Sequence, residues 1–221
     1  SIAFMDDEKV IAFGDSFDGV PFLLESTDAG ASWNRVASDR LPAALDNEGG
    51  FASSGSSILV LDSLTVLIGT GNAEKARLLI TEDGAQSWRA METGLRSGEM
   101  RGACGVFGKD PSRIWIYGGD LSRPDAYRKR LQRYDLTQDS LYAVFEADFQ
   151  GSVYGFTELD LPTSRWQAAA NPNGLFVRRE PMDVWFQLDT VAYWAVVSKE
   201  KHIFAAGPDG RLLRVDFPIA N

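Results

Sequence analysis

Two short stretches decide how this chain folds: Ser26-Thr-Asp28-Ala-Gly30-Ala-Ser32-Trp33 and Thr81-Glu-Asp83-Gly84-Ala-Gln-Ser87-Trp88. Each has a hydroxyl residue, an aspartate two places later and a closing Ser-Trp pair, with the glycine shifted by one place. A short Asp side chain can accept hydrogen bonds from the backbone N–H groups of its own turn, and glycine adopts the positive φ that a tight turn needs. The indole then packs against the sheet. Each stretch therefore predicts a hairpin turn between two strands.

Outward from these turns, the chain repeats a unit of short apolar strands. Residues at equivalent places in five units lie 38 to 55 positions apart: Ile11, Val66, Trp115, Trp166 and Phe204. Such periods, with several strands per unit, are typical of propeller blades, which cover one another because a single sheet cannot bury both of its faces. The sequence predicts an all-β fold in one domain over 1–221, a β-propeller of four-stranded antiparallel blades. The blades are expected at about 1–38, 51–94, 101–147, 151–189 and 191–217.

The first unit shows the expected meander, with strands at Ile2–Met5, Val10–Phe13, Phe22–Ser26 and Trp33–Ala37. The last unit offers only three strands, and the chain opens directly at a first strand. We therefore expect about five blades that form the C-terminal part of a six- or seven-bladed ring; a five-bladed unit with an open seam is the alternative.

Three further local predictions concern single segments. The fourth strand of the third unit is expected at Tyr142–Glu146. Short helical turns are expected at Pro42–Leu45 and Asp125–Gln132.

The composition excludes several classes of function. Thirty-one acidic residues against 22 basic ones give a net charge of −9, which repels nucleic-acid phosphates and anionic lipid headgroups. With one cysteine, Cys104, and one histidine, His202, we expect no internal disulfide, no His-rich metal site and no cofactor, and we assign no metal ligand. No apolar run is long enough to span a membrane, and the given chain shows no signal peptide. Nucleic-acid binding and a transmembrane segment are therefore not expected.

The two turn motifs resemble the Asp-box, or bacterial neuraminidase repeat, of sialidase-like propellers. Degenerate copies follow at Arg178-Arg-Glu180-Pro-Met-Asp-Val-Trp185 and at Tyr134-Asp135, where Ser140 replaces the tryptophan. Nearly the whole chain resembles bacterial propellers of the photosystem II stability and assembly factor group, which are often labelled glycosyl hydrolase or oxidoreductase. The resemblance implies an extracytoplasmic location and a role in protein–protein interaction as a non-catalytic assembly factor.

The candidate site residues form two sets. The residues of the turn motifs are expected to be structural: Ser26, Asp28, Gly30, Trp33, Thr81, Asp83, Gly84 and Trp88. Polar residues in the other turns and links are expected at the opposite end of the propeller, where they could bind a cation or a sugar: Asp15, Asp18, Glu48, Asn72, Glu74, Asp120 and Arg123. The alternative is that these are ordinary hairpin residues.

We expect a non-catalytic scaffold that binds another protein, which could cover the open last blade, and we assign no catalytic residue. The alternative is a carbohydrate-binding or glycoside-hydrolase-like propeller of the sialidase type. Sialidase chemistry needs three arginines on a carboxylate, a tyrosine activated by a glutamate, and an acid/base aspartate, and the sequence shows no motif for that set. A pair of facing carboxylates at the axial end would favour the enzyme.

Overall fold

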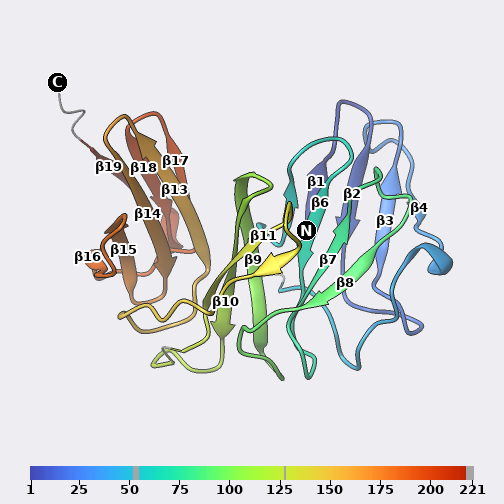
Figure 1. The fold of residues 1–221 in the computed structure, drawn as a ribbon, viewed down its shortest axis with the longest axis horizontal. Helices are drawn as coiled ribbons and strands as arrows, with labels where there is room; N and C mark the ends of the chain where they lie inside the picture. The colour runs from blue at the N-terminus through green and yellow to red at the C-terminus, as the bar shows by residue number, and fades with distance from the viewer. Residues whose placement is uncertain (52–54, 127, 218–221) are drawn as a thin grey trace.

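The computed structural model describes residues 1–51, 55–126 and 128–217, which form five antiparallel sheets in chain order (Figure 1). The first sheet contains β1 (Ile2–Phe4), β2 (Val10–Phe13), β3 (Leu23–Ser26) and β4 (Asn34–Arg35). The second contains β5 (Ile58–Val60), β6 (Val66–Gly69), β7 (Arg77–Thr81) and β8 (Arg89–Glu92). The third contains β9 (Arg101–Asp110), β10 (Arg113–Asp120), β11 (Leu131–Asp135) and β12 (Ser140–Leu141). The fourth contains β13 (Gly155–Leu161), β14 (Ser164–Asn171), β15 (Gly174–Arg179) and β16 (Phe186–Asp189), and the fifth contains β17 (Ala195–Lys199), β18 (His202–Ala206) and β19 (Leu212–Asp216).

The sheets are arranged side by side like the blades of a propeller. The first strands of successive sheets contact each other, from β1 through β5, β9 and β13 to β17. Figure 1 shows the sheets following one another from the blue N-terminal sheet to the red C-terminal one. The predicted all-β fold of antiparallel blades is therefore confirmed, with a fifth sheet that has three strands within the described ranges.

Apolar side chains fill the spaces between neighbouring sheets rather than one central core. Four clusters each join two neighbours, as where Ile11 of β2 packs with Ile68 of β6. In the cluster between the third and fourth sheets, Trp115 and Phe156 lie with ring centroids 5.3 Å apart. Each of the three middle sheets thus buries its faces against the sheets before and after it, and the first and last described sheets each bury one face.

The segment before the second sheet, the β6–β7 turn and the start of β9 approach one another through glycines. Gly71 exchanges backbone hydrogen bonds with Gly49, at 3.1 and 2.9 Å, and forms a further bridge with Gly102. Gly102 has φ +147°, and a Cβ at this position would lie 2.4 Å from Gly71 Cα. Only glycine allows this approach.

Several local predictions are wrong. Neither Pro42–Leu45 nor the described part of Asp125–Gln132 is helical, and the 3₁₀ turns found among the described residues lie at Ser38–Arg40 and Pro208–Gly210. The fourth strand of the third sheet ends at Leu141, because beyond it only isolated hydrogen bonds, from Tyr142 N and Phe145 N, reach β11. No helix within the described ranges has the length and apolar character needed to cross a membrane.

Candidate functional site

In both turn motifs, side-chain oxygens accept hydrogen bonds from backbone N–H groups of the same turn. Asp28 accepts hydrogen bonds from Ser32 N at 2.8 Å and Ser32 Oγ at 2.5 Å, and Ser26 Oγ accepts one from Gly30 N at 2.8 Å. The Trp33 indole N–H donates to the Gly30 carbonyl at 3.0 Å. The hydrogen bonds from Ser32 lower the pKa of Asp28 to about 2.

The second motif repeats the contacts of the aspartate in spite of its shifted glycine, whereas the Trp88 indole N–H has no hydrogen-bond partner among the described residues. Asp83 accepts hydrogen bonds from Ser87 N at 3.0 Å and Ser87 Oγ at 2.6 Å, which lower its pKa to about 2. Both turns contain two consecutive residues with positive φ: 56° and 92° at Ala29 and Gly30, 72° and 66° at Gly84 and Ala85. Glycine fills either of the two places, which explains the shift.

The degenerate copies behave differently from each other. Asp135 still closes its own turn, because its carboxylate accepts hydrogen bonds from Thr137 Oγ1 at 2.6 Å and Gln138 N at 3.2 Å. Glu180 instead forms an ion pair with Arg113 of β10, in the preceding sheet. The acid of this copy therefore joins two sheets instead of closing a hairpin.

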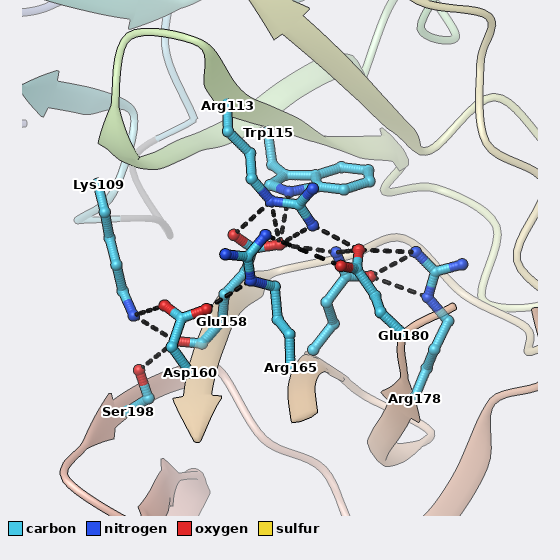
Figure 2. Close-up of polar contacts among 10 residues, drawn as sticks. Lys109, Arg113, Trp115, Glu158, Asp160, Arg165, Arg178, Glu180 and Ser198 are labelled. Carbon is cyan, nitrogen blue, oxygen red and sulfur yellow. Dashed lines mark hydrogen bonds and ion pairs between the residues drawn. The ribbon is translucent and has the colours of Figure 1, made fainter. Parts of the chain in front are cut away.

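Glu180 belongs to a polar network between the third and fourth sheets (Figure 2), which sequence reasoning missed. Glu158 of β13 accepts hydrogen bonds from Arg113 Nη2 at 2.7 Å, Trp115 Nε1 at 2.9 Å and Gln167 Nε2 at 2.8 Å. Burial disfavours the charge on Arg113, but the hydrogen bonds to the two glutamates outweigh this effect and raise its pKa. One guanidinium thus binds both carboxylates.

The outer part of this network reaches the fifth sheet. Lys109 Nζ donates to the Glu158 carbonyl and to Asp160, both at 2.9 Å, and Ser198 Oγ of β17 donates to the same carbonyl at 2.6 Å. On the other side, Arg178 donates to the side-chain oxygen of Gln167 at 2.6 Å. Glu158 and Glu180 lie beside the β9–β10 turn, on the end of the molecule that carries the turn motifs, and both are occupied by these partners. The network therefore links the third, fourth and fifth sheets.

Four of the seven predicted ligand residues do gather at the opposite end. Asp15, Glu48 and Asn72 line a hollow of about 580 Å³, and Asn72 and Glu74 line an adjoining one of about 620 Å³. Glu99, which the sequence analysis did not single out, lines both hollows. We call this pair of hollows the acidic cleft.

Within the acidic cleft, Glu48 is not available to a ligand. Its buried carboxylate accepts hydrogen bonds from Arg77 Nε at 2.9 Å, Thr70 Oγ1 at 2.7 Å and Leu45 N at 3.0 Å. Asn72 Oδ1 likewise accepts a hydrogen bond from Met100 N at 3.1 Å. The exposed carboxylates of the acidic cleft come from Asp15, Asp46, Glu74 and Glu99.

The other three predicted ligand residues, Asp18, Asp120 and Arg123, do not line the acidic cleft. Asp18 pairs with Arg35 at 3.6 Å, and Arg123 pairs with Asp125 at 2.9 Å, both at the surface. Asp120 is buried and bonds Arg101 Nε at 2.7 Å. Burial alone would raise the pKa of Asp120, but hydrogen bonds from Ser122 and Arg101 outweigh it and lower the pKa. Among the described residues, no group of three or more His, Cys, Asp or Glu side chains is placed to hold a metal ion.

A third hollow, of about 440 Å³, is apolar and lies along the first strands of the third, fourth and fifth sheets. Phe107, Phe156 and Val197 contribute to its wall, together with Trp194, whose ring stacks on Tyr154 at 5.5 Å. Val197 also belongs to the exposed face of the last sheet. The apolar groove and that face are therefore continuous.

Comparison with known proteins supports the fold. No known protein family and no curated protein matches the sequence. Among solved structures, YCF48 bound to a D1 peptide superposes with a TM-score of 0.60 at 12% identity over 98% of this chain and 62% of that one. The GH74 xyloglucanase from Xanthomonas campestris superposes with a TM-score of 0.61 at 14% identity, over 95% of this chain and 35% of that one.

A third similar structure is the nidogen/laminin complex, with a TM-score of 0.59 at 13% identity over 97% of this chain and 74% of that one. The fold is that of a partial β-propeller. The chain spans about three fifths of the YCF48 chain and about a third of the xyloglucanase chain. At these identities the likeness concerns the fold alone.

Proposed function

We propose that this chain is a non-catalytic propeller scaffold that binds another protein by accepting a strand at the edge of its last sheet. The proposal rests on the outer edge of β19, which has no paired strand among the described residues. Four sheets pair their third strand with a fourth, whereas the described residues place no strand beside β19. An unpaired edge offers backbone N–H and C=O groups to an extended segment of a partner.

The hydrogen-bond pattern shows which groups of β19 are available. Gly207 N donates to Arg211 O at 3.0 Å, and Phe217 N donates to Lys201 O at 2.9 Å, so the odd-numbered residues face β18. Because alternate residues of an antiparallel strand bond to opposite sides, Leu212, Arg214 and Asp216 direct their backbone groups to the open edge. The neighbouring structures also agree with protein binding, since one contains YCF48 with a peptide and another is a protein complex.

We also propose that the motifs at Asp28 and Asp83 are Asp-boxes with a structural role. Their carboxylates already accept two hydrogen bonds each from the following serine. A carboxylate engaged in this way stabilises its own turn and is poorly placed to bind a ligand.

A peptide with the sequence around β16, the fourth strand of the fourth sheet, tests the proposal. The segment 183–190, which includes β16, would be labelled and titrated into the protein while fluorescence anisotropy is measured. We expect saturable binding to the wild type and to Arg214→Ala, which keeps the backbone N–H, and loss of binding to Arg214→Pro, which removes it. Absence of saturable binding to the wild type, or equal binding to the proline variant, would contradict strand addition.

The acidic cleft supports a second candidate, a carbohydrate-binding or glycoside-hydrolase-like propeller. Exposed carboxylates of Asp15 and Glu99 share one hollow with the amides of Asn47 and Asn72, and such groups hydrogen-bond sugar hydroxyls. Calorimetric titration with xyloglucan oligosaccharides, with Asp15→Asn and Glu99→Gln as variants, separates the two proposals. Heat of binding that both variants abolish favours the sugar, and release of reducing ends would add catalysis.

A further inference from the structure

A hollow of about 310 Å³ lies between the segment that joins the third and fourth sheets, residues 142–154, and the outer strands of the fourth sheet. It shares no residue with the acidic cleft or the apolar groove, and both sheets that bound it have a described neighbour on either side. Three buried rings belong to its lining: Phe149 stacks on Phe176 with ring centroids 4.3 Å apart, and Trp185 meets Phe149 edge-on at 5.2 Å. We call it the linker hollow.

The rest of the lining is polar and has unused hydrogen-bonding capacity. Gln187 Nε2 donates to the Asn173 carbonyl at 2.9 Å, and Asn173 Nδ2 donates to the Pro124 carbonyl at 2.8 Å. These bonds fix the orientation of both amides and leave their oxygens without a partner among the described residues. One oxygen of Asp148 accepts a hydrogen bond from the backbone at 3.2 Å, and the side-chain amide of Gln150 bonds to none of the described residues.

The segment that carries Asp148 and Gln150 is held in place by a buried arginine. Arg130 is 1% exposed, and its guanidinium donates to the carbonyls of Ala147 at 2.8 Å and Gly151 at 2.5 Å, on either side of this segment. No carboxylate among the described residues forms an ion pair with Arg130, although a buried charge is costly. The wall of the linker hollow is therefore fixed by its own contacts, which lowers the cost of ordering it when a ligand binds.

The free groups restrict the class of ligand. Carboxylate and amide oxygens recognise a partner that donates hydrogen bonds, such as a hydroxyl-rich molecule or an organic cation. A cation is opposed by Arg130, which keeps its charge at neutral pH because burial lowers its pKa only to about 10, and whose guanidinium lies 4.6 Å from the centroid of Phe149. An anion is opposed by Asp148. A neutral ligand with several hydroxyl groups avoids both repulsions, and a volume of roughly 300 Å³ is at the lower end of small-molecule sites.

We propose that the linker hollow binds a neutral saccharide unit whose hydroxyl groups bond to the side chains of Asp148, Gln150 and Gln187. Hydrogen bonds from hydroxyls to the carboxylate are charge-assisted and therefore the strongest of the set. The proposal goes beyond the strand-accepting edge of β19 and beyond the sugar site considered for the acidic cleft, because the linker hollow uses neither. It would give the scaffold a separate contact with a glycan.

Saturation-transfer-difference NMR with the methyl glycosides of glucose, galactose, mannose and xylose tests the proposal. We expect a saturable signal from at least one glycoside with the wild-type protein. Gln150→Ala and Gln187→Ala should each weaken that binding at least about fivefold, because each removes a hydrogen-bonding group from the wall. Gln138→Ala, at an exposed residue of the β11–β12 turn that does not line the hollow, is the matched control and should bind as the wild type does.

Two further measurements separate this site from the alternatives, and thermal melts check that each variant folds. Glu99→Gln, in the acidic cleft, should leave the signal unchanged; loss of the signal in this variant would place the sugar in the acidic cleft and overturn the proposal. Displacement of the sugar by N-acetylarginine amide would show a site for cations and contradict the assigned ligand class. Absence of a signal from all four glycosides overturns the proposal, and so does binding that survives both glutamine substitutions in the hollow.

Discussion

Glu158 of β13 accepts hydrogen bonds from Arg113 Nε at 3.0 Å and Arg113 Nη2 at 2.7 Å, although the two residues belong to different sheets. Both side chains are largely removed from water, at 4% and 16% exposure. A buried carboxylate needs such partners, because an unpaired charge in the interior is strongly unfavourable. The pair therefore fixes how the third and fourth sheets meet.

Replacing Glu158 with glutamine should destabilise the protein by about 3 kcal/mol, because Arg113 would lose its main charge partner inside the structure. Urea unfolding followed by tryptophan fluorescence measures the loss. The surface pair of Arg123 and Asp125 provides the control, and Asp125→Asn should change stability by less than about 0.5 kcal/mol. Equal effects of the two substitutions would show that burial does not strengthen the inner pair.

The turn at Asp83 should make stability depend on pH in the acid range. Its folded-state pKa is about 2, against an ordinary value of 3.8, because Ser87 donates hydrogen bonds to the carboxylate. Protonation therefore favours the unfolded chain, and the stabilisation is present above pH 3.8 and lost as the pH falls towards 2. Asp83→Asn should cost about 1 kcal/mol at pH 7 and flatten the stability curve below pH 4. A curve of unchanged slope in the variant would contradict this account.

Cys104 should resist modification in the folded protein. Burial raises the pKa of its thiol to about 12, so almost no thiolate is present at neutral pH. Reaction with a disulfide reagent at pH 8 should be very slow in buffer and rapid in denaturant. Fast labelling of the native protein would show that the third sheet opens locally.

Gly102→Ala should destabilise the contact between β9 and the β6–β7 turn, which joins the second and third sheets. The added Cβ would lie 2.4 Å from Gly71 Cα, and φ at this position is +147°. We expect a loss of about 2 kcal/mol from the backbone conformation alone, measured by thermal unfolding. Gly55→Ala is the matched control, since a Cβ there meets no atom of the described residues within 4 Å. A Gly102→Ala protein as stable as the control would show that the links can move apart.

The sequence predicted those features that depend on residues close together in the chain. Asp28 and Asp83 bond to serines four positions away, so the spacing of the motif contains the whole turn. The strands follow from short apolar runs between such turns. The missed strand end at Leu141 lies where the motif has lost its tryptophan, and with it the local signal.

The network around Glu158 could not be found in this way. Arg113 is 45 positions from Glu158 and 67 from Glu180, and each residue taken alone is an ordinary surface charge. The one available signal was Glu180, which replaces the aspartate of the turn motif with a longer side chain that reaches the preceding sheet. In the acidic cleft, Glu48 was predicted as a ligand residue, but its partner Arg77 comes from a strand 29 positions later.

The separation of the apolar side chains into four clusters has a consequence for the dynamics of the molecule. A sheet in the middle of the row is held on both sides, whereas β1–β4 and β17–β19 share a cluster with one neighbour each among the described residues. Structures built from such nearest-neighbour contacts lose order stepwise. Amide hydrogens should therefore exchange with deuterium first in the outermost sheets and last in β9 and β10, so that opening proceeds from both ends of the row towards its centre.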